Sequence, residues 1–160
     1  MTELTDEELN ERVNILHRFK ALLEQQRAKF QEYLNVLEKQ ETSISNDDTN
    51  AVISHAELEM QVVKGIKNLQ KVIVPMSELY KTTAKGVLPE SEEKVNEIQN
   101  DLEKLQEKVL LQNEKNRELI KNHLVQIRRQ IDNFKNPYRN KRSIYASANE
   151  KQGNLVAVEV

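Results

Sequence analysis

The 160-residue chain carries 24 basic and 26 acidic residues and a formal net charge of −2, so it lacks the basic surplus typical of a nucleic-acid-binding protein. It has no cysteine, which excludes disulfide bonds and thiolate metal sites. Hydrophobic residues make up 38% of the chain, charged residues 31% and aromatic residues only 4%, a combination typical of amphipathic helical bundles and coiled coils.

The first predicted helix follows an acidic N-terminal segment and runs from about residue 6 to residue 44. Thr5 and Glu8 have the spacing of a capping box, in which the two side chains bind free backbone N–H groups of the first turn. The acidic start lacks the apolar segment of a signal peptide, and no apolar run reaches the roughly 18 residues that a membrane span needs. We therefore expect a cytoplasmic protein without stable membrane insertion.

Apolar residues repeat along this first helix with a period of seven. The main row has a member at every seventh position: Leu9, Leu16, Leu23, Phe30, Leu37 and Ile44. A second row holds Phe19 and Tyr33, but Gln26 and Gln40 interrupt it. Further apolar residues beside these rows widen the stripe, which favours one face of a bundle over a two-stranded seam.

A polar turn over residues 45–50 leads into a second predicted helix. Its apolar residues recur at helical spacing: Val52, Ala56, Val63, Ile66, Leu69, Val72, Ile73, Met76 and Tyr80. Pro75 lies inside the pattern and removes one helix hydrogen bond, so we expect a kink there. A loop over residues 81–89 should follow, in which Gly86 suits a helix C-terminal cap.

The third predicted helix covers residues 90–135 and has two apolar stripes. The first comprises Val95, Ile98, Leu102, Leu105 and Val109, and the second comprises Leu119, Ile120, Leu124, Ile127, Ile131 and Phe134. Gln112, Asn113 and Asn116 separate the stripes; the two asparagines are either a buried register device or a solvent-facing pair. Three long helices with short connections predict an all-α fold, an elongated antiparallel bundle or coiled coil of three long helices.

The second stripe of this helix has two interpretations. Antiparallel packing against helices of similar length leaves part of the stripe uncovered, and an uncovered strip of this kind suits the binding of a partner helix. The stripe is equally compatible with bundle core.

Beyond the stripe, Asn136 and Pro137 end the helix, so we expect a bundle over residues 1–135 and a flexible C-terminal tail over 136–160. The tail begins with the basic residues Arg139, Lys141 and Arg142, which are typical of a solvated segment or of a weak site for an acidic partner.

Residues that carry chemistry are few. His55 and Glu59, four apart, are a possible pair of metal ligands, but no further ligand accompanies them, which favours a solvated polar pair. The glycines are isolated and form no phosphate-binding loop. We therefore expect a protein that binds other proteins without catalytic activity, cofactor or metal; a helical-bundle metalloenzyme is a distant alternative.

Three segments resemble flagellar export chaperones of the FlgN family. In residues 111–120, Leu-Gln-Asn-Glu-Lys-Asn-Arg-Glu-Leu-Ile, two asparagines three apart precede the apolar half of the last long helix, as in that family. Residues 143–147, Ser-Ile-Tyr-Ala-Ser, and residues 34–41 of the first helix are also similar to it. The apolar end of the tail, residues 155–160, and the stretch 136–139 depart from the family pattern.

The resemblance implies a cytoplasmic chaperone of the flagellar type III secretion apparatus. Such a chaperone binds hook-associated (hook–filament junction) proteins, prevents their premature assembly and delivers them to the cytoplasmic domain of the export gate. The client-binding residues would be those of the second stripe, Leu119, Ile120, Leu124, Ile127, Ile131 and Phe134, and Tyr145 would bind the gate. The alternative is a structural coiled-coil adaptor protein without chaperone activity, which would self-associate through the heptads of the first helix.

Overall fold

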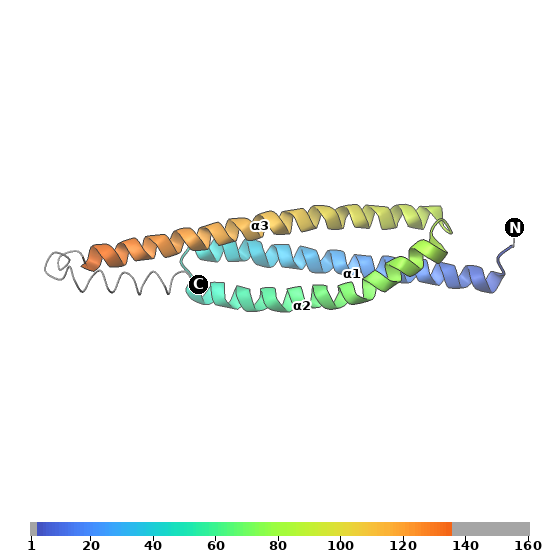
Figure 1. Ribbon diagram of the computed structural model, residues 1–160, viewed down its shortest axis with the longest axis horizontal. Coiled ribbons are helices and arrows are strands. Elements are labelled where there is room, and N and C mark those ends of the chain that lie inside the picture. Colours follow the sequence, from blue (N-terminus) through green and yellow to red (C-terminus); the bar gives the residue numbers. More distant parts are fainter. Residues whose placement is uncertain (1–2, 136–160) are drawn as a thin grey trace. The chain divides into compact units, whose positions relative to one another are not determined.

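The structure is a computed structural model that describes residues 3–135. Three long helices account for most of this part: α1 (Asp6–Ser45), α2 (Thr49–Leu79) and α3 (Pro89–Lys135) (Figure 1). A short π-helix, η1 (Tyr80–Ala84), joins α2 to α3. The chain divides into two compact units, Met1–Leu119 and Ile120–Val160, and α3 crosses the boundary between them. The predicted all-α bundle of three long helices is confirmed.

The start of α1 matches the sequence prediction. The Thr5 backbone N–H donates to Glu8 Oε2 at 3.1 Å, and the Glu8 backbone N–H donates to Thr5 Oγ1 at 3.2 Å, which completes the capping box. The helix ends at Ser45, one residue beyond the predicted end. Asp48 then caps α2, because its Oδ1 accepts a hydrogen bond from the Ala51 backbone N–H at 3.2 Å. Local side-chain caps thus fix the start of α1 and the start of α2.

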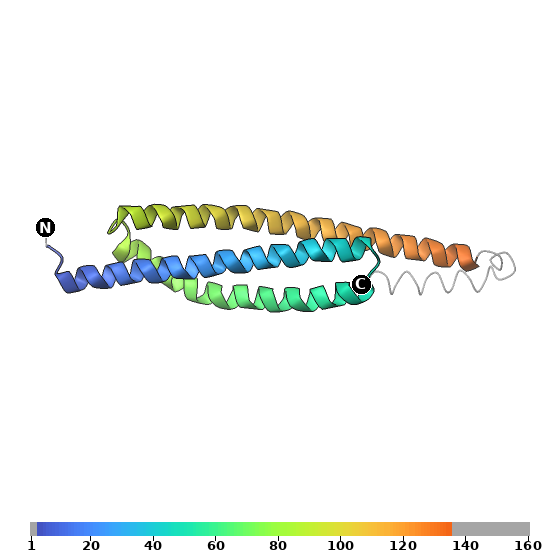
Figure 2. The same cartoon turned by 180° about the vertical axis from the view of Figure 1, so that it is seen from behind.

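The connection between α2 and α3 differs from the prediction. Pro75 lies inside α2, and the axis of α2 changes direction toward its C-terminal end in Figures 1 and 2. The chain then stays helical to Ala84 instead of entering a loop at Lys81, because the Lys85 N–H donates to Tyr80 O at 2.9 Å, five residues back, which closes a π-turn. Gly86 follows with φ +82°, a conformation that suits glycine.

The core of the first unit consists of two clusters, each built from all three long helices. One contains Leu16, Phe19, Leu23, Ile73, Tyr80, Ala84, Val95, Ile98 and Leu102; the other contains Tyr33, Leu34, Leu37, Val62, Leu105 and Val109. The Phe19 and Tyr80 rings stack with centroids 4.8 Å apart, which ties η1 to α1. Leu9 and Val72, which the periodicity places in apolar stripes, are instead 42% and 51% exposed.

The glutamines of α1 are part of this core. Gln26 and Gln40 are 3% and 6% exposed, so the row that they interrupt in the sequence is buried along with the main heptad row. Gln26 Nε2 donates to Gln70 Oε1 at 3.3 Å and to Ile66 O at 3.5 Å, while Gln26 Oε1 is buried with no hydrogen-bond donor.

Among residues 3–135, none of the helices combines the length and the apolar character that a membrane span requires.

Candidate protein-binding surface

Asn116 joins α3 to α1 in a buried polar layer. Its side chain is 3% exposed, and its Nδ2 donates to Leu37 O at 2.9 Å and to Gln40 Oε1 at 3.2 Å. Its Oδ1 accepts from Gln112 Nε2 at 3.0 Å, so both ends of the amide are bonded. Of the two interpretations of Asn116, the buried one is therefore correct, and its position opposite Gln40 suits a register device.

Asn113 lies beside this layer and reaches all three helices through one tyrosine. Its Nδ2 donates to the Tyr33 hydroxyl at 3.2 Å, and that hydroxyl donates to Glu59 Oε1 of α2 at 3.0 Å. Burial is the largest factor that raises the pKa of Tyr33, and the Glu59 carboxylate raises it further. The phenol therefore stays protonated and serves as a donor at this three-helix junction.

Glu41 closes the polar layer on the solvent side. Its Oε1 lies 2.7 Å from Lys115 Nζ, and its Oε2 accepts from Gln112 Nε2 at 2.6 Å. The hydrogen bond from Lys115 is the main reason that the pKa of Glu41 is lowered, followed by the bond from Gln112. The sequence signal for this layer is Gln40, which interrupts the second apolar row of α1 and yet is buried opposite Asn116.

His55 and Glu59 each contact a hydroxyl group of α1. His55 Nδ1 lies 3.3 Å from Ser43 Oγ, whereas Glu59 accepts the Tyr33 hydroxyl. Both side chains are half-buried, so the pair is engaged with α1 and is not the solvated pair that the sequence favoured. Within residues 3–135, no group of three or more His, Cys, Asp or Glu side chains is placed to hold a metal ion.

The apolar stripe of α3 changes from buried to exposed along the helix. Its first part, from Val95 to Val109, consists of core residues at most 9% exposed. The residues that follow the polar layer are large and apolar yet 39–49% exposed; we call them the α3 strip: Ile120 (39%), Leu124 (43%), Ile127 (49%) and Ile131 (47%). Offsets of four, seven and eleven residues place them on one face of the helix.

The remaining predicted site residues are placed as follows. Leu119 is half-buried at the end of the first unit. Phe134 lies in the last turn of α3, where the side chains are not among those described, and Tyr145, Arg139, Lys141 and Arg142 lie outside the described residues. The structure thus brings four of the six residues to one exposed face, the α3 strip, and client binding by any of the six stays a prediction.

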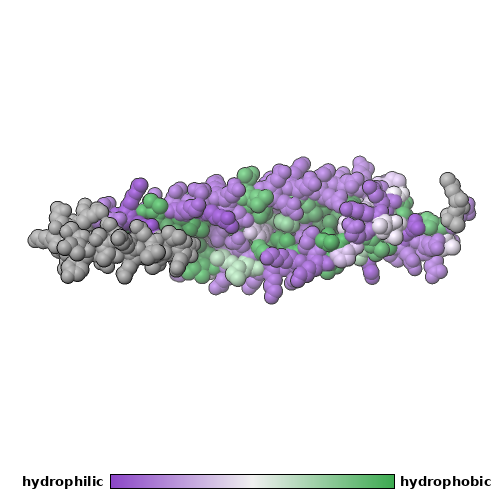
Figure 3. Space-filling view, viewed as in Figure 1, coloured by the Kyte–Doolittle hydropathy of each residue, from purple (hydrophilic) through white to green (hydrophobic). Residues whose placement is uncertain are grey.

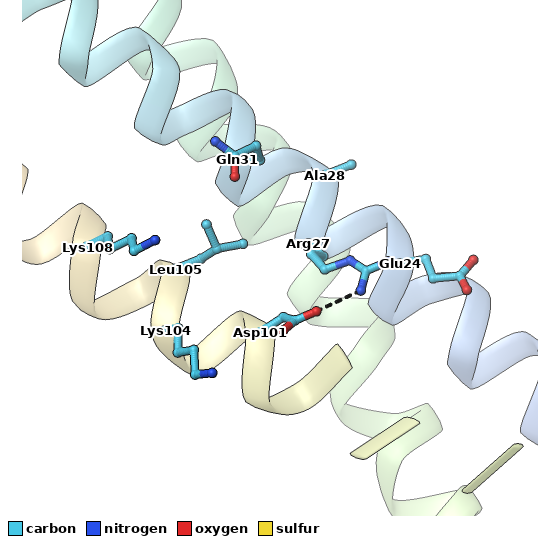
Figure 4. Close-up of a pocket in the computed structure, with 8 residues that line it drawn as sticks. All are labelled: Glu24, Arg27, Ala28, Gln31, Asp101, Lys104, Leu105 and Lys108. Atoms are coloured by element: carbon cyan, nitrogen blue, oxygen red, sulfur yellow. Dashed lines mark hydrogen bonds and ion pairs between the residues drawn. The ribbon is translucent and has the colours of Figure 1, made fainter. Parts of the chain in front are cut away.

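A second surface feature is a shallow groove of about 470 Å³ between α1 and α3 (Figure 4). Arg27 spans it, with Nη1 2.9 Å from Asp101 Oδ2, and Lys104 and Lys108 lie along its α3 side. Six of the eight residues that line the groove are charged or polar, and only Ala28 and Leu105 are apolar. The face of the molecule drawn in Figure 3 is mostly polar, with apolar patches among the polar side chains. The groove therefore offers less apolar contact area to a partner than the α3 strip.

Comparisons with known proteins give a consistent result. The sequence model of the family described as FlgN protein matches residues 15–153, which include most of α1, all of α2 and α3, and the polar layer. An uncharacterized protein of Treponema pallidum (strain Nichols) is 39% identical over 132 residues, which cover 82% of each chain. No solved structure matches the chain.

Proposed function

This chain belongs to the FlgN family and is a flagellar export chaperone, and we propose that its clients are the hook–filament junction proteins. In this proposal the chaperone works in the cytoplasm, covers terminal helical segments of a client and so prevents premature assembly. It then delivers the client to the export gate of the flagellar type III secretion apparatus. It acts by binding alone, without catalysis or cofactor.

The α3 strip is the observation that supports a client site. Clients that polymerise through amphipathic helices present an apolar face, and a long helix with an exposed apolar face can cover it reversibly. Ile120, Leu124, Ile127 and Ile131 are each about half exposed, so a client helix laid on them would bury the rest of each side chain. The buried stripe from Val95 to Val109 has no such surface to offer.

The magnitude of this contact is modest. Burying an exposed Ile or Leu fully contributes about 1.5–3 kcal/mol, so four half-buried side chains contribute about 3–6 kcal/mol together. A micromolar complex needs about 8 kcal/mol after the losses of translational and rotational freedom. The α3 strip can thus anchor a client, but further contacts, including those of Leu119 and Phe134, must add to it.

The test is calorimetric titration of the full chain with a purified hook–filament junction protein. Ile127→Asp and Ile131→Asp should each weaken binding more than about 30-fold, because a carboxylate would have to enter the apolar contact. Leu111→Asp is the matched control, since Leu111 lies on α3 and is 66% exposed but is not on the strip face. Its affinity should stay within about twofold of wild type.

Two results would contradict the proposal. Client binding that survives both strip substitutions places the site elsewhere. A collapse of helicity in Ile127→Asp, measured by circular dichroism, means that these residues are core. The adaptor alternative makes a different prediction, namely a stable self-associated species in size-exclusion chromatography with light scattering and no complex with the client.

A further inference from the structure

The part of the chain that carries the α3 strip is basic, although the chain as a whole is not. Residues 120–133 contain the cations Lys121, Arg128 and Arg129 and a single carboxylate, Asp132, whereas the whole chain has a formal net charge of −2. All four charged side chains are exposed. A partner that docks along this segment therefore meets a positive local field.

The charges are unevenly distributed around the helix. Lys121, Arg128 and Asp132 each follow a strip residue by one position, which puts them about 100° from it, along one edge of the α3 strip. The opposite edge, one position before the strip residues, holds His123, Gln126 and Gln130 and no formal charge at pH 7. Arg129 lies two positions after Ile127, about 200° away, on the face opposite the strip.

One charged edge and one uncharged edge are the arrangement by which paired helices select a partner and its direction. In coiled coils, charged residues that flank an apolar seam pair with opposite charges at heptad spacing on the other helix. Lys121 and Arg128 are seven residues apart, which is this spacing. The apolar contact of the α3 strip contributes too little free energy for tight binding by itself. Charged contacts along its edge would therefore add to the affinity and to the choice of partner.

We propose that the α3 strip receives a client helix whose apolar face is flanked on one side by carboxylates seven residues apart, which pair with Lys121 and Arg128. Asp132 on the same edge repels a third carboxylate, so the charge order, two cations and then one anion, favours one direction of the client helix over the other. This inference rests on the proposed client site and adds the chemistry of the partner: an amphipathic helix with one acidic edge.

The experiment compares two neighbouring arginines in the full chain. Arg128→Glu should weaken binding of a purified hook–filament junction protein about fivefold or more at 0.1 M NaCl, and Lys121→Glu/Arg128→Glu about tenfold or more. Arg129→Glu makes the same change in charge on the opposite face and should change the affinity less than about twofold. Each variant is first checked for wild-type helicity by circular dichroism.

Salt dependence supplies the second readout. Raising NaCl from 0.1 M to 1 M shortens the screening length from about 10 Å to about 3 Å. Wild-type affinity should therefore fall, whereas the affinity of the double variant should rise, because salt screens the repulsion between its two glutamates and the client carboxylates. Equal losses in Arg128→Glu and Arg129→Glu would overturn the acidic-edge proposal, as would wild-type affinity in the double variant. If Ile127→Asp still abolishes binding in that case, the client site stands and only the partner chemistry is wrong; if Ile127→Asp also binds normally, the site itself is wrong.

Discussion

Removing the Asn116 amide should destabilise the first unit far more than removing its neighbour Asn113. Asn116 is 3% exposed and makes three hydrogen bonds, to Leu37 O, Gln40 Oε1 and Gln112 Nε2. Each such bond contributes about 1 kcal/mol net, and a buried acceptor left without a donor costs about 1–3 kcal/mol. Gln40 Oε1 is that acceptor, since Gln40 is only 6% exposed. We therefore expect Asn116→Ala to lower the free energy of unfolding by about 2–4 kcal/mol.

The matched comparison is Asn113→Ala, which removes a single bond to the Tyr33 hydroxyl at a half-buried position. That change should lower the free energy of unfolding by about 1 kcal/mol. Urea titration followed by far-ultraviolet circular dichroism measures both values from the midpoint and slope. A double-mutant cycle with Gln40→Ala isolates the pair: the double variant should lose about 1 kcal/mol less than the sum of the single variants, because no acceptor is then left unpaired.

The reasoning fails if Asn116→Ala and Asn113→Ala differ by less than about 0.5 kcal/mol, or if the cycle is additive. Either outcome would mean that the polar layer is hydrated in solution and does not couple α1 to α3.

Three further predictions concern other residues. Gln26→Leu should raise the free energy of unfolding by about 1 kcal/mol in the same urea titration, because Gln26 Oε1 is buried without a hydrogen-bond donor. The partner of Gln26, Gln70, is exposed and can bond to water instead. A destabilised variant would contradict this prediction. The lowered pKa of Glu41 means that its bonds to Lys115 and Gln112 stabilise the fold above the ordinary carboxyl pKa, and that this contribution is lost as pH falls through the lowered value. Between pH 5 and pH 3, the free energy of unfolding of Glu41→Gln should therefore fall less than that of wild type, measured by urea titration at each pH. Equal falls in the two proteins would refute a stabilising role for the Glu41 carboxylate. Tyr145→Ala should weaken binding to the purified cytoplasmic domain of the export gate several-fold and leave client affinity unchanged, measured by calorimetry at low salt; unchanged gate binding would rule out Tyr145 as an anchor.

Local chemistry in the sequence determined the helices themselves. Thr5 and Glu8 predict the start of α1 because a capping box involves only residues within one turn, and the structure contains both of its hydrogen bonds. Asp48 and the surrounding polar residues predict the turn before α2 for the same reason. The resemblance of residues 111–120 to the FlgN family likewise depends on sequence alone, and the family match over residues 15–153 confirms it.

Only the tertiary structure decided which faces are covered. Heptad spacing is the same for Leu9, 42% exposed, as for Leu16, fully buried, because periodicity states which side of a helix a residue occupies and not whether another helix lies opposite it. For the same reason the sequence could not tell buried Asn116 from a solvent-facing asparagine, nor foresee that Gln40 would be its partner 76 residues away. The exposure of Ile120, Leu124, Ile127 and Ile131 belongs to this class as well. Their apolar pattern continues that of the core, and only their exposed fractions of 39–49% mark them as a surface.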